Sequence, residues 1–434
     1  MQRTQSGERD PLAWCAALSL IFAAMAFYHL GIPGKMYFDE VHYVPAARAL
    51  LGARLANAEH PLLAKEAIAA AIRLCGDHPL SWRLPSAVMG TVGLFAFGRA
   101  LWWASQRRFA TLAGMVLLAT DFAWFIQSRI AMLDMTMAGL AMVALWQVAA
   151  AVRCPNRARA HLALAGLAFG LAMGAKWSAA PVIACVVIAL AAVRIRAAFA
   201  SRAKAGIAAT NTAPIPGITL SEMLFWLLSV PIFVYWLTFV PAFLYCHYPI
   251  DPAAFLAWQR YMVQLQESVL TRHPYQSVWY QWIVNWRAVW YLYERVDGAQ
   301  RGIVLIGNPF TMLAGLPALL WCAVTGWRKC WARLGRERLA IAGLYLACLA
   351  MWVFAPKPVQ FYYHYLLAGT TLIAALALAL DALWRRRDAW RWTAPAALAL
   401  SVGSFGYFYP IIAAAPLYHG TASFEQWMWL ASWR

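Results

Sequence analysis

Long apolar runs constrain the fold of this chain more than any other feature of its sequence. Windows of about 20 residues, the length of helix that crosses a bilayer, give runs at 11–31, 84–104, 109–127, 135–152, 160–175, 178–194, 222–245, 303–325, 339–355, 364–383 and 392–412. Only 12% of the residues are charged, which is about half the fraction typical of soluble domains. The sequence therefore predicts an all-α integral membrane protein of about 11 transmembrane helices, with residues 1–434 forming a single polytopic domain.

Basic residues fall in every second segment between the runs. With the N-terminus inside, the inner segments carry Arg3, Arg9, Arg107, Arg108, Arg153, Arg157, Arg159, Arg194, Arg196, Arg202, Lys204, Arg328, Lys329, Arg333, Arg336, Arg338, Arg385, Arg386, Arg387 and Arg391. This alternation follows the positive-inside rule, so we expect these segments to be cytoplasmic and the C-terminus to lie outside. The loops account for the net charge of +18, and no nucleic acid is expected as a partner. No small-residue cleavage site follows the first run, which favours a spanning helix over a signal peptide.

Two outer segments are long, at 34–83 and 246–302. Both mix aromatic, charged and helix-compatible residues, which predicts structured caps on the membrane. The tryptophans and tyrosines of the second segment fit an interfacial aromatic belt. The segment 205–219 is the only one with the composition of a linker. The eight cysteines show no zinc or redox spacing, although Cys75 and Cys246 could both face outward and pair.

Two adjacent acids, Asp39 and Glu40, follow the first apolar run. Neighbouring residues on a helix or turn do not share a face, so the two carboxylates should have different partners. One could accept a proton from an acceptor while the other holds the acceptor or a cation. Alternatively, both are solvated acids that cap a helix next to the membrane.

A second polar group in the same segment is Glu59-His60-Pro61, followed by Lys65. A lysine and a histidine at the outer membrane face suit the head group of an anionic lipid. The alternative is an interfacial helix start, in which the lysine extends its ammonium toward water.

Charged residues also interrupt the apolar runs at Arg129, Asp134 and Lys176. Such residues are costly at a membrane boundary unless they are paired or functional. The guanidinium of Arg129 could bind a phosphate with two parallel hydrogen bonds, or it could form a structural pair with Asp134. Lys176 allows the same two interpretations.

Aromatic and basic residues recur later in the chain. His273 and Tyr275 could contact a sugar or an acceptor, and Lys357 and His364 could contact a phosphate. An interfacial belt would explain the same residues. All these groups are nevertheless predicted at the outer face, and this convergence points to one site.

Several of these motifs together resemble the protein O-mannosyltransferase family. The resemblance rests on Phe38-Asp39-Glu40-Val41-His42-Tyr43, His60-Pro61…Lys65, Arg129…Leu133-Asp134-Met135, Lys176-Trp177, His273-Pro274-Tyr275…Ser277…Trp279, Gly307-Asn308-Pro309 and Tyr363-His364-Tyr365. The motifs occur in matching order over residues 35–370, which is most of the chain.

The resemblance implies a type-C glycosyltransferase in the bacterial cytoplasmic membrane. Such an enzyme transfers mannose from a polyprenyl-phosphate carrier, with inversion, to Ser or Thr hydroxyls of secreted or membrane proteins at the outer face. Asp39 would be the base and Glu40 the acid that positions the acceptor. Arg129, Lys65, His60, Lys176 and His364 would bind the donor phosphate, and Glu59, Asp134, His273 and Tyr275 would contact the acceptor or support the site. No metal site or other cofactor is implied, although a divalent cation is left open.

Two departures qualify this resemblance. Leu62 stands where the family usually has a second proline, and the second outer segment is too short for the β-trefoil domain of the eukaryotic members. The short outer segment points to a compact bacterial-type member. The alternatives are a transferase acting on a glycolipid, as in aminoarabinose transfer to lipid A, and a transporter of a lipid-linked sugar.

Overall fold

The computed structural model describes residues 7–200, 213–330, 332–418 and 420–434. The predicted cytoplasmic residues Arg3, Arg202 and Lys204, and part of the expected linker, lie outside these ranges. The helices are α1 (Leu12–Phe27), α2 (Glu40–Leu51), α3 (Leu63–Cys75), α4 (Pro79–Ser105), α5 (Arg108–Ala119), α6 (Phe122–Gln127), α7 (Leu133–Arg153), α8 (Ala158–Ala175), α9 (Ala180–Ala200), α10 (Leu220–Leu224), α11 (Val230–Leu237), α12 (Val240–Phe243), α13 (Phe255–Glu267), α14 (Trp279–Ile283), α15 (Pro309–Arg328), α16 (Arg333–Phe354), α17 (Leu366–Trp384) and α18 (Thr393–Ile412). The two strands are β1 (Val289–Val296) and β2 (Ala299–Leu305).

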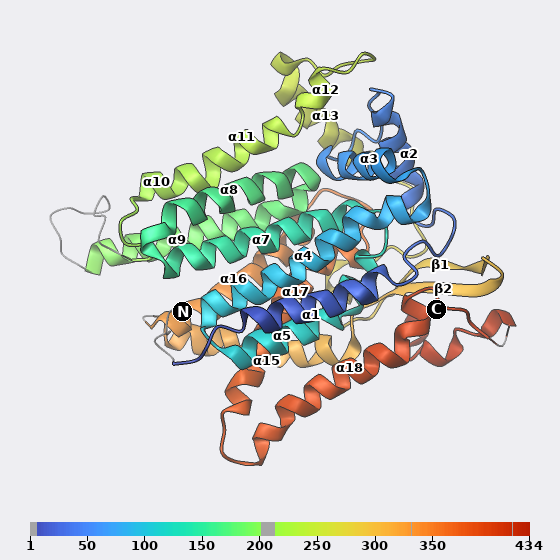
Figure 1. Cartoon of the computed structure of the whole chain (residues 1–434). Coiled ribbons are helices and arrows are strands. Elements are labelled where there is room, and N and C mark those ends of the chain that lie inside the picture. The colour runs from blue at the N-terminus through green and yellow to red at the C-terminus, as the bar shows by residue number, and fades with distance from the viewer. Residues whose placement is uncertain (1–6, 201–212, 331, 419) are drawn as a thin grey trace.

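The long helices form one bundle in which they run roughly side by side (Figure 1). Within the described residues, nine helical segments are long and apolar enough to cross a membrane, and α1 and α5 are shorter apolar helices. α6 extends the path of α5 after a break at Asp121, whose carboxylate accepts the N–H of Trp124. The predicted fold of about eleven crossings is therefore confirmed.

The helix α17 lies at the centre of the bundle. Its apolar window is 83% buried, whereas the windows of α9 and of the α10–α11 segment are only 28% and 22% buried. The residues of α17 are apolar on every face of the helix. A helix of this kind is stable only where neighbours or lipid cover every face. α5, α15 and α16 supply that cover.

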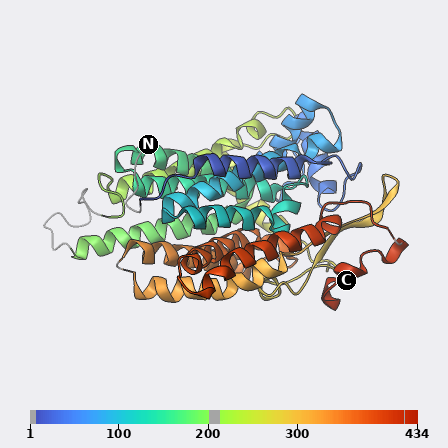
Figure 2. The same cartoon turned by 60° about the horizontal axis from the view of Figure 1, so that its bottom comes forward.

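The two ends of the bundle differ in chemistry. One end carries Arg107, Arg153, Arg338 and Arg385 at or near the ends of α5, α7, α16 and α17, and we name it the basic end. The opposite end carries residues 34–78 and the β1–β2 hairpin, and we name it the loop end. The described chain starts at the basic end and finishes at the loop end in both views (Figures 1 and 2).

The hairpin is the main departure from the all-α prediction. β1 pairs antiparallel with β2 around Asp297-Gly298, and both turn residues have positive φ, as a two-residue hairpin turn requires. Two predicted belt aromatics, Trp290 and Tyr291, are buried in this strand, and Trp282 is buried just before it. The interfacial prediction is wrong for these three residues. The apolar stretch from 303 continues a strand, and α15 begins only at Pro309.

The seventh crossing is not one regular helix. It contains α10, a π-helical turn at Phe225–Ser229, α11 and α12. Pro231 has no N–H to donate, which accounts for an irregularity at this point. This crossing packs against α8 over Gly166, Gly170 and Gly174, where an added Cβ would collide with Trp226, Val234 and Thr238. Only glycine permits this close helix approach.

The cysteines do not pair in the described part of the chain. Cys75 and Cys246 are both exposed at the loop end, and both are free. The option of a disulfide between them is therefore wrong.

Candidate active site

Residues from four parts of the chain meet around Tyr363 at the loop end. The Tyr363 hydroxyl donates to Oδ2 of Asp39 at 3.5 Å, and Nζ of Lys176 lies 5.0 Å from the Tyr363 ring centre. Asp39 immediately precedes α2 and is half-buried, whereas Lys176 and Tyr363 are buried. The structure thus brings together Asp39 and Lys176, which lie far apart in the sequence.

Lys176 is held by a buried ion pair. Its Nζ donates to both carboxylate oxygens of Asp134, at 2.7 and 2.8 Å. Lys176 ends α8 and Asp134 lies in the first turn of α7, so the pair joins two crossings at the loop end. The predicted pairing of Asp134 with Arg129 is wrong, because Lys176 is the partner.

Arg129 makes its hydrogen bonds to the backbone at the end of α1. Its guanidinium donates to the carbonyls of Met25, Ala26, Tyr28 and His29 at 2.7–3.3 Å, where α1 ends. A helix leaves its last carbonyls without partners, and this arginine satisfies them. Arg129 therefore anchors the end of α1, and this geometry does not support its predicted role as a phosphate ligand.

Glu40 is also fully buried and fully engaged. Arg83 donates to its two carboxylate oxygens at 2.8 and 2.9 Å, and the N–H of Ala131 donates to it at 2.9 Å. The other donors of Arg83 bind the carbonyls of Leu30, Pro33 and Lys35. This arrangement does not support Glu40 as an acid that positions the acceptor. The pair instead fixes the segment that presents Asp39.

The second polar group folds back on itself. Nζ of Lys65 donates to the carbonyls of Asn57 at 2.5 Å and His60 at 2.9 Å, and this side chain has no exposed surface. Lys65 therefore organises the loop, which does not support direct phosphate binding. The His60 ring packs near Tyr43, and the Glu59 carboxylate accepts from the Asn57 amide at 2.6 Å.

His364 borders the cluster from the start of α17. Its Nδ1 accepts the N–H of Phe361 at 3.0 Å, so the neutral ring carries its proton on Nε2. That Nε2 and the Oγ of Ser178 are buried and have no hydrogen-bond partner within the described residues. Both residues line a cavity of about 10 Å³ together with Asp134 and Tyr363. His364 and Ser178 thus offer two uncommitted polar atoms beside the Lys176 pair.

His273 and Tyr275 are separated from Tyr363 by the ring of Phe361. The His273 ring packs 5.0 Å from Phe361, which stacks on Tyr363 at 5.5 Å. The structure places these two predicted residues behind an aromatic wall, and it gives neither a direct contact with Asp39.

Burial and neighbouring charges bring the pKa values of Asp39 and Lys357 closer to neutral pH. Burial raises the pKa of Asp39 to about 6, although Lys176 and His42 oppose this shift. Burial and the nearby charge of Lys176 together lower the pKa of Lys357 to about 8. A carboxylate with a pKa of about 6 is ionised at neutral pH and still basic enough to accept a proton.

These pKa values predict a bell-shaped dependence of activity on pH. Below about pH 6 Asp39 gains a proton and loses its basicity, and above about pH 8 Lys357 loses the charge that attracts an anion. We expect kcat/KM to fall on both sides. The Lys357→Arg variant should keep the acid limb and lose the alkaline one, because arginine stays charged. An unchanged alkaline limb would assign it to another group, such as Lys65, whose pKa burial lowers to about 7.

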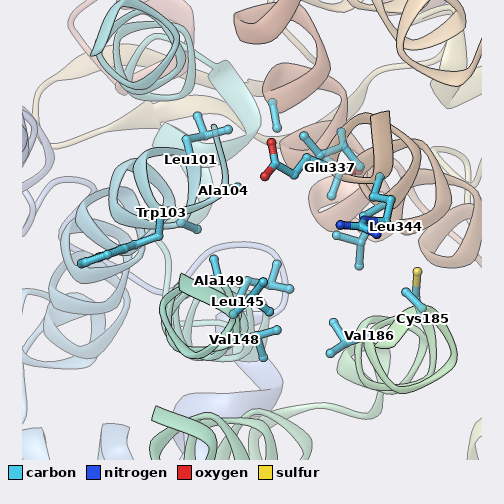
Figure 3. Close-up of a pocket in the computed structure, with 18 of the residues that line it drawn as sticks. Leu101, Trp103, Ala104, Leu145, Val148, Ala149, Cys185, Val186, Glu337 and Leu344 are labelled. Atoms are coloured by element: carbon cyan, nitrogen blue, oxygen red, sulfur yellow. The ribbon is translucent and has the colours of Figure 1, made fainter. Parts of the chain in front are cut away.

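An apolar cavity lies elsewhere in the bundle. It has a volume of about 300 Å³ between α4, α7, α9, α16 and α17, and its lining is mostly apolar (Figure 3). Glu337 and Arg336 lie on its rim, toward the basic end. With few polar groups and no contact with Asp39, this cavity is not a site for sugar chemistry.

Comparisons with known proteins identify the family of this chain. The family model described as dolichyl-phosphate-mannose-protein mannosyltransferase matches residues 79–247. The C-terminal four-transmembrane region of protein O-mannosyltransferase matches residues 252–433. A polyprenol-phosphate-mannose–protein mannosyltransferase of Mycolicibacterium smegmatis is 26% identical over 97% of this chain and 93% of its own length. One from Corynebacterium glutamicum is 25% identical over 98% and 94%.

Solved structures share the fold. The protein O-mannosyltransferase Pmt1-Pmt2 complex of S. cerevisiae, bound to the sugar donor, has a chain with a TM-score of 0.80 and 14% identity over 99% of this chain and 93% of its own. ArnT from Cupriavidus metallidurans, bound to undecaprenyl phosphate, gives a TM-score of 0.55 and 13% identity over 93% and 77%. The fold is that of the type-C membrane glycosyltransferases. Since the two family models together span most of the sequence, the chain belongs to the protein O-mannosyltransferase family.

The sequence interpretation missed one central residue. Arg83 was placed only at a loop boundary, yet it is the partner of Glu40. A signal was present, because a lone arginine near the start of a long apolar helix needs a partner.

Proposed function

We propose that this chain transfers mannose from a polyprenyl-phosphate carrier to Ser or Thr hydroxyls of proteins. The observation that carries the proposal is the group of Asp39, Tyr363, Lys176 and Asp134 at the end of a family-typical bundle. It combines a carboxylate base with a cation at a membrane boundary. Both are needed when the donor is already activated by a phosphate.

Asp39 takes the acceptor proton in this proposal. The acceptor oxygen forms a bond to C1 of mannose on the face opposite the phosphate, which inverts that carbon. The bond from C1 to the phosphate oxygen breaks and its electron pair leaves with the phosphate, while the hydroxyl proton moves to Asp39. The raised pKa of Asp39 suits this transfer.

Lys176 and Lys357 stabilise the charge that develops on the leaving phosphate. Both interact electrostatically with Asp39 and therefore lie near the reacting centre. Fixed cations in a site with little water act more strongly than in bulk solvent. His364 contributes the proton on Nε2 as an uncommitted donor beside this group.

A glycolipid acceptor remains the second candidate, because ArnT shares the fold. The TM-score of 0.55 is well below the 0.80 of the protein mannosyltransferase complex, so the protein acceptor is better supported. The test is to incubate purified protein with polyprenyl-phosphate mannose and either Ser/Thr peptides or lipid A. Mannosylated peptide is the expected product. Transfer to lipid A alone would support the second candidate. Movement of the intact donor across the membrane of vesicles, without transfer of its sugar, would support a transporter.

We also propose that the protein lies in the cytoplasmic membrane and that its loop end faces the periplasm. The basic end carries the arginine clusters, and such clusters favour the cytoplasmic side. Single-cysteine proteins that retain either Cys75 or Cys246, both exposed at the loop end, should react with an impermeant thiol reagent in cells with a permeable outer layer. A protein whose only cysteine replaces Lys329, exposed at the basic end, should stay unlabelled until the membrane is opened. The reverse labelling would invert the topology.

A further inference from the structure

A second charged cavity lies at the basic end, remote from Asp39. It has a volume of about 240 Å³ and is lined by Arg107, Arg338, Leu378, Asp381, Ala382 and Arg385. We name it the arginine cavity. The arginines come from the N-terminal side of α5, the first turns of α16 and the residue after α17. Three separate crossings thus contribute a cation to one hollow.

Acidic residues neutralise the cavity only in part. Asp381 lies 3.9 Å from Arg107 and 4.0 Å from Arg385, which is loose for an ion pair. Glu8 lies 3.4 Å from Arg107. Glu337 and Asp381 also interact electrostatically with Arg338, but neither is an ion-pair partner of Arg338 within the described residues.

Among the three arginines, Arg338 is the one with a buried N–H, that of Nε, which lacks a hydrogen-bond partner within the described residues. Its Nη1 donates to Thr325 at 3.2 Å, and its guanidinium lies 4.1 Å from the ring centre of Trp321. A guanidinium has five N–H donors, so most of them are available to an anion with several oxygens.

The surroundings place this cavity at the level of lipid head groups. Trp327, Trp390 and Trp392 are more than half exposed near the same ends of α15 and α18. Tryptophans of this kind mark the interface between the hydrocarbon core and water. Basic pockets between membrane helices at this level bind the head groups of anionic lipids.

We propose that the arginine cavity binds the phosphodiester of an anionic phospholipid. Arg338 and Arg385 contact the phosphate oxygens, and Leu378 and Ala382 line the side toward the acyl chains. On the topology proposed above, this lipid belongs to the cytoplasmic leaflet. The lipid is a structural ligand and takes no part in sugar transfer, which occurs at the other end.

The test measures lipid binding to full-length protein that has been stripped of lipid in neutral detergent. Phosphatidylglycerol, phosphatidylcholine and inorganic phosphate are added separately, and the thermal midpoint and the lipid retained in native mass spectrometry are recorded. We expect phosphatidylglycerol to raise the midpoint saturably and to stay bound at one copy. The Arg338→Gln/Arg385→Gln variant should bind it at least about tenfold more weakly, because it loses charge-assisted hydrogen bonds.

The matched control is Arg328→Gln/Arg387→Gln, which removes the same charge from exposed positions at the same end. It should retain the lipid. The Arg338→Lys variant keeps the charge without the planar fork and should bind with intermediate affinity, which guards against misfolding of the double variant. Equal binding by the cavity variant and the control would overturn the proposal. An equal response to inorganic phosphate or phosphatidylcholine would overturn the assignment to an anionic lipid.

Discussion

Replacing Asp39 with Asn is expected to lower the turnover of mannose transfer by about 10²- to 10⁴-fold, the usual contribution of a positioned base. The amide keeps the size and polarity of the side chain but cannot take the acceptor proton. The residue lies outside the buried Glu40–Arg83 pair and is half-buried, so the protein should still fold and insert. Mannose transfer and donor binding are measured side by side on the purified variant.

The matched control is Asp77→Asn, which changes an acid in the same outer segment that pairs with Arg48 at the surface. It should leave turnover close to that of the wild type. Near-normal turnover of a well-folded Asp39→Asn protein would show that the base is another residue. A collapse of donor binding together with turnover would instead mean that Asp39 holds the donor.

The second large effect is expected for single substitutions of Glu40 or Arg83, which should lower the stability of the folded protein. Both side chains have no exposed surface, so Glu40→Gln or Arg83→Gln leaves one buried charge without its partner. Breaking such a pair costs about 3–5 kcal/mol, more than most single substitutions. We expect a much lower thermal midpoint and poor recovery of folded protein for each single variant.

The double variant Glu40→Gln/Arg83→Gln separates this role from catalysis. It removes both charges, so it should be more stable than either single variant. Turnover per folded molecule should then recover at least in part, because Asp39 is retained. If Glu40→Gln is stable and affects only the acceptor KM, then Glu40 positions the acceptor after all.

The crossings of the fold could be predicted because each depends on local composition. A bilayer requires about 20 apolar residues for every helix, and the basic segments between them alternate along the chain. Even the irregular seventh crossing is a continuous apolar run in the sequence. Its hydropathy does not reveal the break in the helix at Pro231 and the π-helical turn at Phe225–Ser229.

The hairpin was missed because its aromatic residues also fit a membrane interface. Its sequence does contain a specific signal: Asp297-Gly298 lies between β-branched and aromatic residues, and Asp-Gly is a favoured two-residue turn. Hydropathy windows joined β2 to α15 and so concealed the helix start at Asn308-Pro309, where the Asn308 side chain accepts the N–H of Thr311.

The candidate site was predictable as a set of residues but not as a set of contacts. The sequence placed Asp39, Asp134, Lys176 and His364 at one membrane face. It could not tell whether Arg129 or Lys176 meets Asp134, because either crossing could lie next to α7. The packing of α8 against α7 decides this, and it leaves Arg129 at the end of α1.

The Lys176–Asp134 pair has a consequence for product release. In the proposed reaction the donor carries a phosphodiester, whereas the spent carrier is a monoester with more negative charge. A lysine without a carboxylate partner would hold this product more tightly than the donor and slow each cycle. Because Asp134 already binds Lys176 through both oxygens, the outgoing phosphate competes with a resident anion. We therefore expect the pair to limit affinity for the spent carrier, which can then diffuse back into the bilayer.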